Sequence, residues 1–378
     1  MTSSASSPRS RFSYRTRRAF LQAAMAAGAG VMLPGCGWTL AEVRPVQARK
    51  GKSDELSLYT WTNYVDPPLV EGFTTQTGIR VTYDIFNSNE IMLATFQAGK
   101  GAAYSILYPS DYKVEEMIEL GFLSELDHSR LEGLSNILPQ FQNSVYDPGN
   151  RHSIPISWGT TGLIYDADRV NPGPEDWNFL WDNTDKLHRR ITLLDDVREV
   201  MGATLRSLGH SYNSTDPQQI KEAYEKLVIL KPAIASFNTD AWKEQLLAGD
   251  LVLAMVYSAD AVRLIKDNAD RNLKYVIPKS GTSLWSDTIV MPKTAPNPEA
   301  AYAWINYMLQ PSVAAQITQR QYFATPNQAA YDQLPAPVRN NTSLFPSEEI
   351  LANCERISPI DPKILAIYER YWTLLTSG

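Results

Sequence analysis

Cysteine and histidine are scarce in this chain. Its 378 residues include two cysteines, Cys36 and Cys354, and four histidines scattered along the sequence. Two distant cysteines do not make a disulfide framework, and the spacing of cysteines and histidines does not match a zinc site. We therefore expect packing to hold the fold, with no metal and no cofactor.

The sequence also lacks the short motifs of common enzyme classes. It has no G-x-S-x-G and no G-x-G-x-x-G after a strand, and the segment GKGAAYS at 99–105 lacks the Lys-Ser/Thr ending of a P-loop. Paired carboxylates in a cleft can hydrolyse glycosides, but no pattern here identifies the polar subsites that a sugar would need. The sequence therefore favours a binding protein over an enzyme.

Basic residues are few outside the N-terminus. The net charge is −6, yet residues 1–35 hold five arginines and no acidic residue, so the rest of the chain is more acidic still. This balance argues against a nucleic-acid-binding protein and suits a cationic small ligand. The nineteen Tyr and nine Trp suit the same ligand, because aromatic ring faces carry negative charge density.

The N-terminal segment has the pattern of an export signal. RTRRAFLQ at 15–22 carries paired arginines, and AAMAAGAGVML at 23–33 is an apolar run too short to span a bilayer. We expect residues 1–35 to be a Tat-type signal for the periplasm and 36–54 to be a tether. LPGC at 33–36 resembles a lipoprotein box, so two outcomes stay open: lipidation of Cys36, which would anchor the protein to the membrane, or cleavage without lipidation.

The remaining pattern alternates short β-rich runs with longer helical stretches, which indicates βαβ units and an α/β fold. The first unit has strand-like runs at 56–61, 79–86 and 104–110 and helical stretches at 67–78, 89–99 and 112–121. After the run at 152–166 a second unit follows, with segments at 191–196, 216–231, 251–260, 274–278, 285–292 and 298–309.

The segment LLDDVREV at 193–200 has two readings. Asp196 and Glu199 stand three residues apart after an apolar run, which fits a helix N-cap and its capping box. The same spacing fits two carboxylates at the end of a strand, where ligands bind in open α/β sheets. Other aromatic and polar residues also gather at predicted strand ends, so we favour a site and allow capping to coexist with it.

Several segments in order resemble one family. LYTWTNYVDPPLVEGFTTQTGIRVTYDIFNSNE at 58–90 is similar to the periplasmic spermidine/putrescine-binding proteins of ABC transporters, and the likeness continues through YPSDYKVEEMIELGFL, HSIPISWGTTGL, LLDDVREVMGATLRSLGHSYNSTDP, LWSDTIVMP, AYAWINYML and YFATPNQAA. The resemblance implies a type II periplasmic binding protein fold, in which two lobes with mainly parallel sheets enclose a ligand cleft. We expect lobe 1 at 55–161 plus 287–331 and lobe 2 at 162–286 plus 332–378.

The resemblance also implies a substrate site. Asp196 and Glu199 match an acidic pair that holds one terminal ammonium, whereas Trp285 and Asp287 match an aromatic platform and a carboxylate for a second amine. Tyr257 stands where the family usually has Trp. The full set of implied site residues is Trp61, Thr62, Tyr64, Ser110, Tyr112, Asp196, Glu199, Tyr257, Trp285, Asp287 and Phe323.

Two positions depart from the family pattern. Asn63 stands where the spermidine binder carries Glu, and Arg356 in NCERISP falls near a position where the family offers Gln. We expect a monomeric solute-binding protein that captures putrescine or spermidine and delivers it to an ABC permease. The alternatives are another small cationic or zwitterionic solute, or a ligand sensor without a role in transport.

Overall fold

The structure is a computed structural model that describes residues 51–86 and 88–377. The predicted export signal, most of the predicted tether and Cys36 lie outside the described residues. Within the described ranges, no helix combines the length and apolar character needed to cross a bilayer.

One nine-stranded mixed sheet forms the framework, with the strand order β2-β1-β3-β9-β4-β7-β5-β6 and with β8 paired to β4. The strands are β1 (Glu55–Trp61), β2 (Arg80–Phe86), β3 (Ile106–Leu107), β4 (Ser153–Asp166), β5 (Ile191–Leu193), β6 (Ile234–Phe237), β7 (Leu253–Tyr257), β8 (Leu273–Val276) and β9 (Leu284–Val290).

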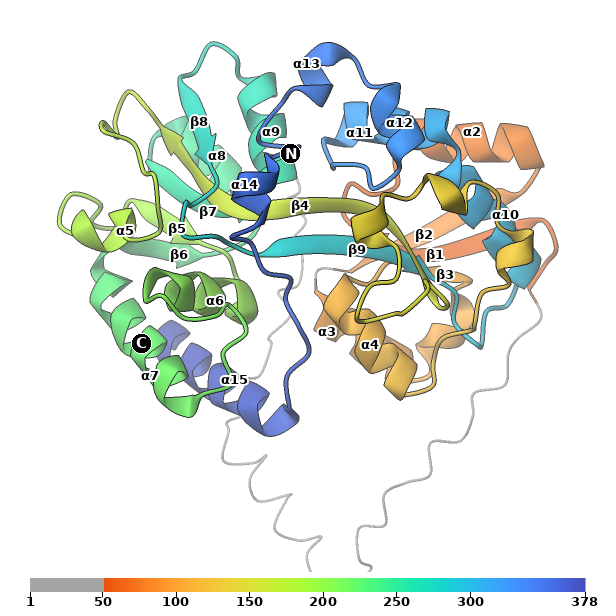
Figure 1. Ribbon diagram of the computed structural model, residues 1–378, viewed down its shortest axis with the longest axis horizontal. Coiled ribbons are helices and arrows are strands. Elements are labelled where there is room, and N and C mark those ends of the chain that lie inside the picture. Colours follow the sequence, from red (N-terminus) through yellow and green to blue (C-terminus); the bar gives the residue numbers. More distant parts are fainter. Residues whose placement is uncertain (1–50, 87, 378) are drawn as a thin grey trace, which may run out of the picture. The chain divides into compact units, whose positions relative to one another are not determined.

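The direction of pairing divides the sheet into two parallel groups joined by two antiparallel strands. β1 pairs in parallel with β2 and β3, and β5 pairs in parallel with β6 and β7. The long strands β4 and β9 lie antiparallel to each other between these groups (Figure 1). The parallel pairs agree with the predicted βαβ units, whereas the antiparallel pairs come from β4 and β9.

The helices follow the predicted pattern at most positions. Asp66 caps the first of them, two prolines occupy its first positions, and Gly78 ends it with a φ of 74°, a conformation that glycine adopts without steric cost. The helices are α2 (Pro67–Thr77), α3 (Asn89–Gln97), α4 (Asp111–Glu119), α5 (Phe179–Asp182), α6 (Val197–Ser207), α7 (Pro217–Leu230), α8 (Trp242–Ala248), α9 (Ser258–Asp267), α10 (Pro298–Leu309), α11 (Pro311–Gln321), α12 (Gln328–Asp332), α13 (Ala336–Arg339), α14 (Glu348–Leu351) and α15 (Pro362–Thr376).

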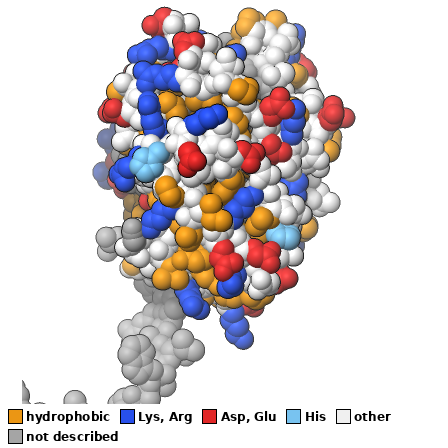
Figure 2. Space-filling view, turned by 90° about the vertical axis from the view of Figure 1, so that its left-hand side faces the viewer, with side chains coloured by type: hydrophobic (Ala, Val, Ile, Leu, Met, Phe, Trp, Pro, Cys, Tyr) orange, Lys and Arg blue, Asp and Glu red, His pale blue; other side chains and the backbone are white. Residues whose placement is uncertain are grey.

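The apolar side chains pack into separate cores. One core joins β1, β3 and α10 around residues such as Leu58 and Trp304. Another joins β5, α6 and α15 around Leu193 and Tyr368, and a smaller one surrounds Trp242. On the surface, Figure 2 shows Lys, Arg, Asp and Glu side chains interspersed on one face, while a few charged side chains, among them Glu199 and Asp287, are buried.

Candidate functional site

Asp196 follows β5 and caps α6. Its backbone is extended, and its Oδ1 accepts hydrogen bonds from the amides of Arg198 at 2.9 Å and Glu199 at 3.0 Å. These bonds satisfy two amides that the first turn of a helix leaves without partners. Burial raises the pKa of Asp196 above its ordinary value, and the nearby Glu90 charge adds to that rise.

Glu199 does not complete a capping box in this fold. Its buried carboxylate instead accepts hydrogen bonds from the Tyr212 hydroxyl at 2.7 Å and the Ser283 hydroxyl at 2.8 Å. Burial, and then the charge of Asp196, raises the pKa of Glu199 to about 7. The two interpretations of LLDDVREV therefore apply to different residues. Asp196 caps the helix, whereas Glu199 is a buried acid whose carboxylate accepts hydrogen bonds from two hydroxyls.

Asp287 lies on β9, where hydroxyl groups from other elements meet it. Ser110, at the start of α4, donates to its Oδ1 at 2.6 Å, and the Tyr64 hydroxyl donates to its Oδ2. The Tyr64 hydroxyl is also within 2.9 Å of the Ser157 hydroxyl on β4. Burial raises the pKa of Asp287, although the hydrogen bonds from Ser110 and Tyr64 oppose that rise.

Aromatic rings flank these acids. Tyr64 stacks on Phe323 with ring centroids 4.2 Å apart, and Tyr257 meets Trp285 edge to face at 5.8 Å. Trp61, at the end of β1, packs against Phe86 at 4.4 Å. Such rings supply both apolar area and cation-attracting faces.

Tyr112 connects the two acidic regions. Asn89 at the start of α3 donates to the Tyr112 hydroxyl at 3.0 Å and to the Ser110 hydroxyl at 3.1 Å. Burial raises the pKa of Tyr112 well above its ordinary value, and the charges of Glu90 and Asp196 raise it further. The Tyr257 pKa is raised in the same way, by burial and then by charges that include Asp196 and Asp287, so these acids and rings share one neighbourhood.

One predicted site residue, Thr62, and the departing position Asn63 lie at the margin of this neighbourhood. Thr62 and Asn63 are exposed in the turn after β1, and Asn63 has a φ of 69°, a conformation in which Asn is enriched. The structure thus brings together the predicted acids and most of the predicted rings, while the Thr62 side chain faces solvent.

Glu90 is an acid that the sequence reasoning missed. It is the second residue of α3, and the Tyr112 hydroxyl lies 3.4 Å from its Oε1. In the sequence, a Glu in the first turn of a helix is explained by its favourable interaction with the helix dipole and does not by itself indicate a site. The sequence does not reveal that Glu90 lies near Asp196. The helices α3 and α6 that carry them belong to different parallel groups of the sheet, so only the fold brings the two acids together.

Asp111 was also missed, and it explains the position of Arg356. The Asp111 carboxylate is buried, and the Arg356 guanidinium contacts it at 2.9 Å. The same guanidinium lies 5.0 Å from the centroid of the Phe141 ring. Burial raises the pKa of Asp111 to about 7, against the opposing effect of Arg356. The cationic group at this position therefore has a carboxylate partner.

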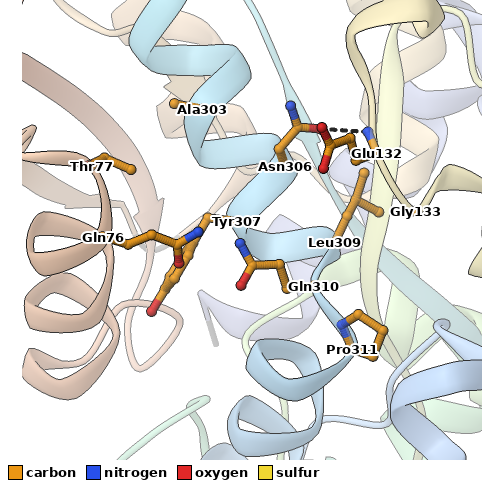
Figure 3. Close-up of a pocket in the computed structure, with 10 residues that line it drawn as sticks. All are labelled: Gln76, Thr77, Glu132, Gly133, Ala303, Asn306, Tyr307, Leu309, Gln310 and Pro311. Carbon is orange, nitrogen blue, oxygen red and sulfur yellow. Dashed lines mark hydrogen bonds between the residues drawn. The ribbon is translucent and has the colours of Figure 1, made fainter.

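Two surface hollows lie away from these residues. One, of about 350 Å³, lies between the end of α2 and the junction of α10 with α11, where Asn306 accepts a hydrogen bond from the Glu132 amide (Figure 3). The other, of about 420 Å³, lies beside α5 and the start of β5. Neither hollow is lined by a predicted site residue.

The fold and the buried acids beside aromatic rings define a solute-binding protein, and comparison with known proteins agrees. The profile of the bacterial extracellular solute-binding protein family matches residues 68–346, and the chain belongs to this family. The chain is 36% identical over 332 residues to the spermidine/putrescine-binding periplasmic protein of Salmonella typhimurium. The matched region covers 88% of this chain and 94% of that protein.

Solved structures show the same two-lobe fold. The crystal structure of the spermidine/putrescine ABC transporter substrate-binding protein PotD from Streptococcus pneumoniae, in complex with calcium and HEPES, is 37% identical to this chain. It matches with a TM-score of 0.77 over 86% of this chain and 99% of that one. The TpPotD lipoprotein of Treponema pallidum is 26% identical and matches with a TM-score of 0.78, over 86% and 100% of the two chains.

Proposed function

We propose that this protein captures a polyamine, putrescine or spermidine, in the periplasm and delivers it to the permease of an ABC importer. The observation that carries the proposal is the grouping of buried Glu199, buried Asp287 and half-buried Asp196 close to aromatic rings such as Tyr257. Its relatives from Salmonella typhimurium and Streptococcus pneumoniae, which are named for spermidine and putrescine, support it.

The chemistry of a polyamine fits these groups. A polyamine is a chain of methylenes between ammonium groups, so its site needs carboxylates at the spacing of the amines and rings along the stem. A hydrogen bond to a charged group contributes about 1.5–3 kcal/mol, and a cation–π contact contributes about 0.5–2 kcal/mol. A few of each support micromolar binding, about −8 kcal/mol, after the costs of ordering.

The proposed roles follow the geometry. Asp196 and Glu199 hold one ammonium, and Asp287 holds another. Asp196 has a second carboxylate oxygen besides the one that caps α6, and Asp287 is already oriented by two hydroxyls. The residues that enclose the methylenes or border the cleft are Trp61, Thr62, Tyr64, Ser110, Tyr112, Tyr257, Trp285 and Phe323.

The departures from the family pattern do not exclude a cationic ligand under this proposal. Arg356 is paired with Asp111, so its charge is balanced where it stands. Asn63 supplies no anion, and Glu90, close to Tyr112, is itself paired with Lys113 at 3.4 Å. Asp196, Glu199 and Asp287 have no ion-pair partner among the described residues. The site therefore keeps a surplus of negative charge for a ligand with two or more ammonium groups.

The wider organisation is part of the same proposal. We propose that lobe 1 comprises 55–161 plus 287–331 and lobe 2 comprises 162–286 plus 332–378, with the ligand held between them by a monomer. Residues 1–35 act as a Tat-type export signal, and 36–54 tether the lobes to a Cys36 that is either lipidated or removed.

Isothermal titration with putrescine, spermidine and spermine tests this function, with an amino acid and an oligosaccharide as comparison ligands. We expect micromolar binding of one polyamine and weaker binding of the others. Binding of the amino acid or the sugar, with no heat from any polyamine, would overturn the assignment while leaving the family unchanged.

Neutralising the acids tests the residues. We expect Asp196→Asn and Asp287→Asn each to weaken polyamine binding at least about tenfold, a loss of about 1.4 kcal/mol. Asn caps a helix about as well as Asp, so Asp196→Asn should still fold. Asp216 caps α7 through the Gln218 amide at 2.8 Å, and Asp216→Asn is the matched control that should bind normally. A folded Asp196→Asn/Asp287→Asn variant with unchanged affinity would rule out this site.

A further inference from the structure

A hollow of about 420 Å³ lies at the starts of the parallel strands β5 and β7, whereas the acids lie beyond their other ends. Arg190, which lines it, directly precedes β5, and Val252 directly precedes β7. Asp196 follows the other end of β5, and Tyr257 is the last residue of β7, which pairs with β5 in parallel. The hollow is therefore a separate feature of this half of the molecule, and a ligand bound in it would not touch the proposed polyamine site.

Three cationic side chains line this hollow: Arg169, Lys186 and Arg190. Arg169 Nη1 donates to the Gly249 carbonyl at 2.8 Å, and Arg190 Nη2 donates to the same carbonyl at 2.9 Å. The shared carbonyl fixes two guanidinium groups beside each other. Like charges at such short range repel each other unless a negative group balances them.

The described part of the chain balances this charge incompletely. Asp166 contacts Arg169 Nε at 3.3 Å, whereas Arg190 and Lys186 have no acidic partner within ion-pair distance among the described residues. Arg190 Nε is also buried and has no hydrogen-bond partner there. A buried donor without an acceptor is costly.

Capping of α8 explains part of this arrangement. Gly249 ends α8 in the left-handed conformation, and basic side chains commonly bind carbonyls at helix C-termini. That reading accounts for the two contacts with the Gly249 carbonyl. It does not account for Lys186, for the free Nε of Arg190 or for the hollow itself.

We propose that this hollow binds an oxyanion of the phosphate class. Planar guanidinium groups match the geometry of phosphate oxygens, and a lysine adds a mobile third charge. Asn171 also lines the hollow and Phe179 supplies an apolar wall, whereas the Asn183 side-chain amide already donates to the Phe179 carbonyl at 3.0 Å. The combination suits an organic phosphate, whether a soluble phosphate ester or the headgroup of a phospholipid.

Figure 2 views the end of the molecule that carries α5 and α7, where basic and acidic side chains lie interspersed on the surface. Because the lining residues lie apart from the polyamine acids, this inference does not rest on the proposed function.

Titration with phenyl phosphate, inorganic phosphate and benzyl alcohol tests the site directly. We expect phenyl phosphate to bind, inorganic phosphate to bind more weakly because it lacks the ring, and benzyl alcohol not to bind. Flotation with vesicles of phosphatidylglycerol and of phosphatidylcholine identifies the source: binding to vesicles together with phenyl phosphate points to a headgroup, and binding to phenyl phosphate alone points to a soluble ester.

Two variants connect binding to these residues. Arg190→Gln and Lys186→Gln should each weaken phenyl phosphate binding about tenfold while leaving polyamine titrations unchanged. Lys186 is exposed, so Lys186→Gln tests the site even if Arg190→Gln fails to fold. Lys363→Gln, an exposed lysine on α15, is the matched control. Absence of phenyl phosphate binding, or equal binding by wild type and Lys186→Gln, would overturn the proposal.

Discussion

At the scale of single residues, burial sets the protonation of the acids. Glu199 is buried, and burial followed by the charge of Asp196 raises its pKa to about 7. A carboxyl group in this position stays neutral until the solution approaches neutral pH, whereas an ammonium ligand is held best by the ionised form. Binding of a polyamine to such a site is therefore linked to the release of protons.

Glu199→Gln should flatten two pH dependences. The ordinary pKa of this group is 4.5 and its folded value is about 7, so between these values the folded state holds a proton that the unfolded state has lost. The contribution of Glu199 to the free energy of unfolding consequently falls as pH rises from 4.5 to about 7. Polyamine affinity rises over the same pH range because the carboxylate becomes ionised. Glu199→Gln should reduce both slopes and should weaken binding above pH 7 about tenfold.

Urea denaturation and titration at a series of pH values measure these slopes. Glu244→Gln, on the exposed surface of α8, is the control and should behave like the wild type. If the Glu199→Gln variant keeps the wild-type slope of affinity against pH, Glu199 does not hold the ammonium.

At the scale of elements, the pairing of β4 with β9 positions the aromatic platform. Gly159 on β4 lies opposite Trp285 on β9. A Cβ at Gly159 would lie 2.3 Å from Trp285 Cζ2 and 2.6 Å from Ser258 Oγ. The absence of a side chain at Gly159 therefore leaves the space that the Trp285 indole occupies. Trp285 in turn stands two residues before Asp287 on β9.

Gly159→Ala should displace the indole. We expect a loss of about 1–3 kcal/mol in the free energy of unfolding, typical of overpacking, and weaker polyamine binding because Trp285 shifts. Urea denaturation and calorimetric titration measure the two effects. Gly159→Ala combined with Trp285→Phe should regain stability, since the smaller ring makes room, but not affinity. Unchanged affinity in the single variant would show that Trp285 does not contact the ligand.

Much of the element pattern could be predicted from the sequence because its signals are local. Asp66, two prolines and Gly78 mark the helix that the structure shows at 67–77. The predicted strand at 104–110 is an exception, since only Ile106–Leu107 pair as β3. Pro109 stands two residues after Leu107, and proline has no amide hydrogen to donate to a ladder.

Long-range partners within the site could not be read from residue types alone. Asp196 and Asp287 were predicted through the family resemblance, and the structure adds the hydroxyls of Ser110 and Tyr64 that orient Asp287. Asp111 and Arg356 are 245 positions apart. Nothing in either local sequence indicates that one neutralises the other.

At the scale of the whole molecule, the Asp111–Arg356 pair joins distant parts of the chain. Asp111 lies on α4, and Arg356 lies between α14 and α15, next to Glu355, which bonds Arg206 on α6 at 2.8 Å. A buried ion pair adds little by itself, but removal of one partner leaves a charge without compensation. The pair therefore links α4 to the C-terminal segment of the other parallel group.

A double-mutant cycle tests this link. We expect Arg356→Gln to lower the free energy of unfolding by about 3 kcal/mol, because it leaves the buried Asp111 carboxylate alone. Asp111→Asn should cost less, since Arg356 retains partial exposure to water. The double variant should be more stable than the sum of the single losses predicts. Additive losses in urea denaturation would show that the two residues do not interact.

The strand β4 has a consequence for how such a protein can be recombined. Over its 14 residues it contributes Trp158 to one core, Leu163 to a second and Ile164 to a third. A chimera that takes each parallel group from a different parent must therefore join foreign partners somewhere along the path β3-β9-β4-β7. The two parallel groups are not independent units that can be exchanged without disturbing these contacts.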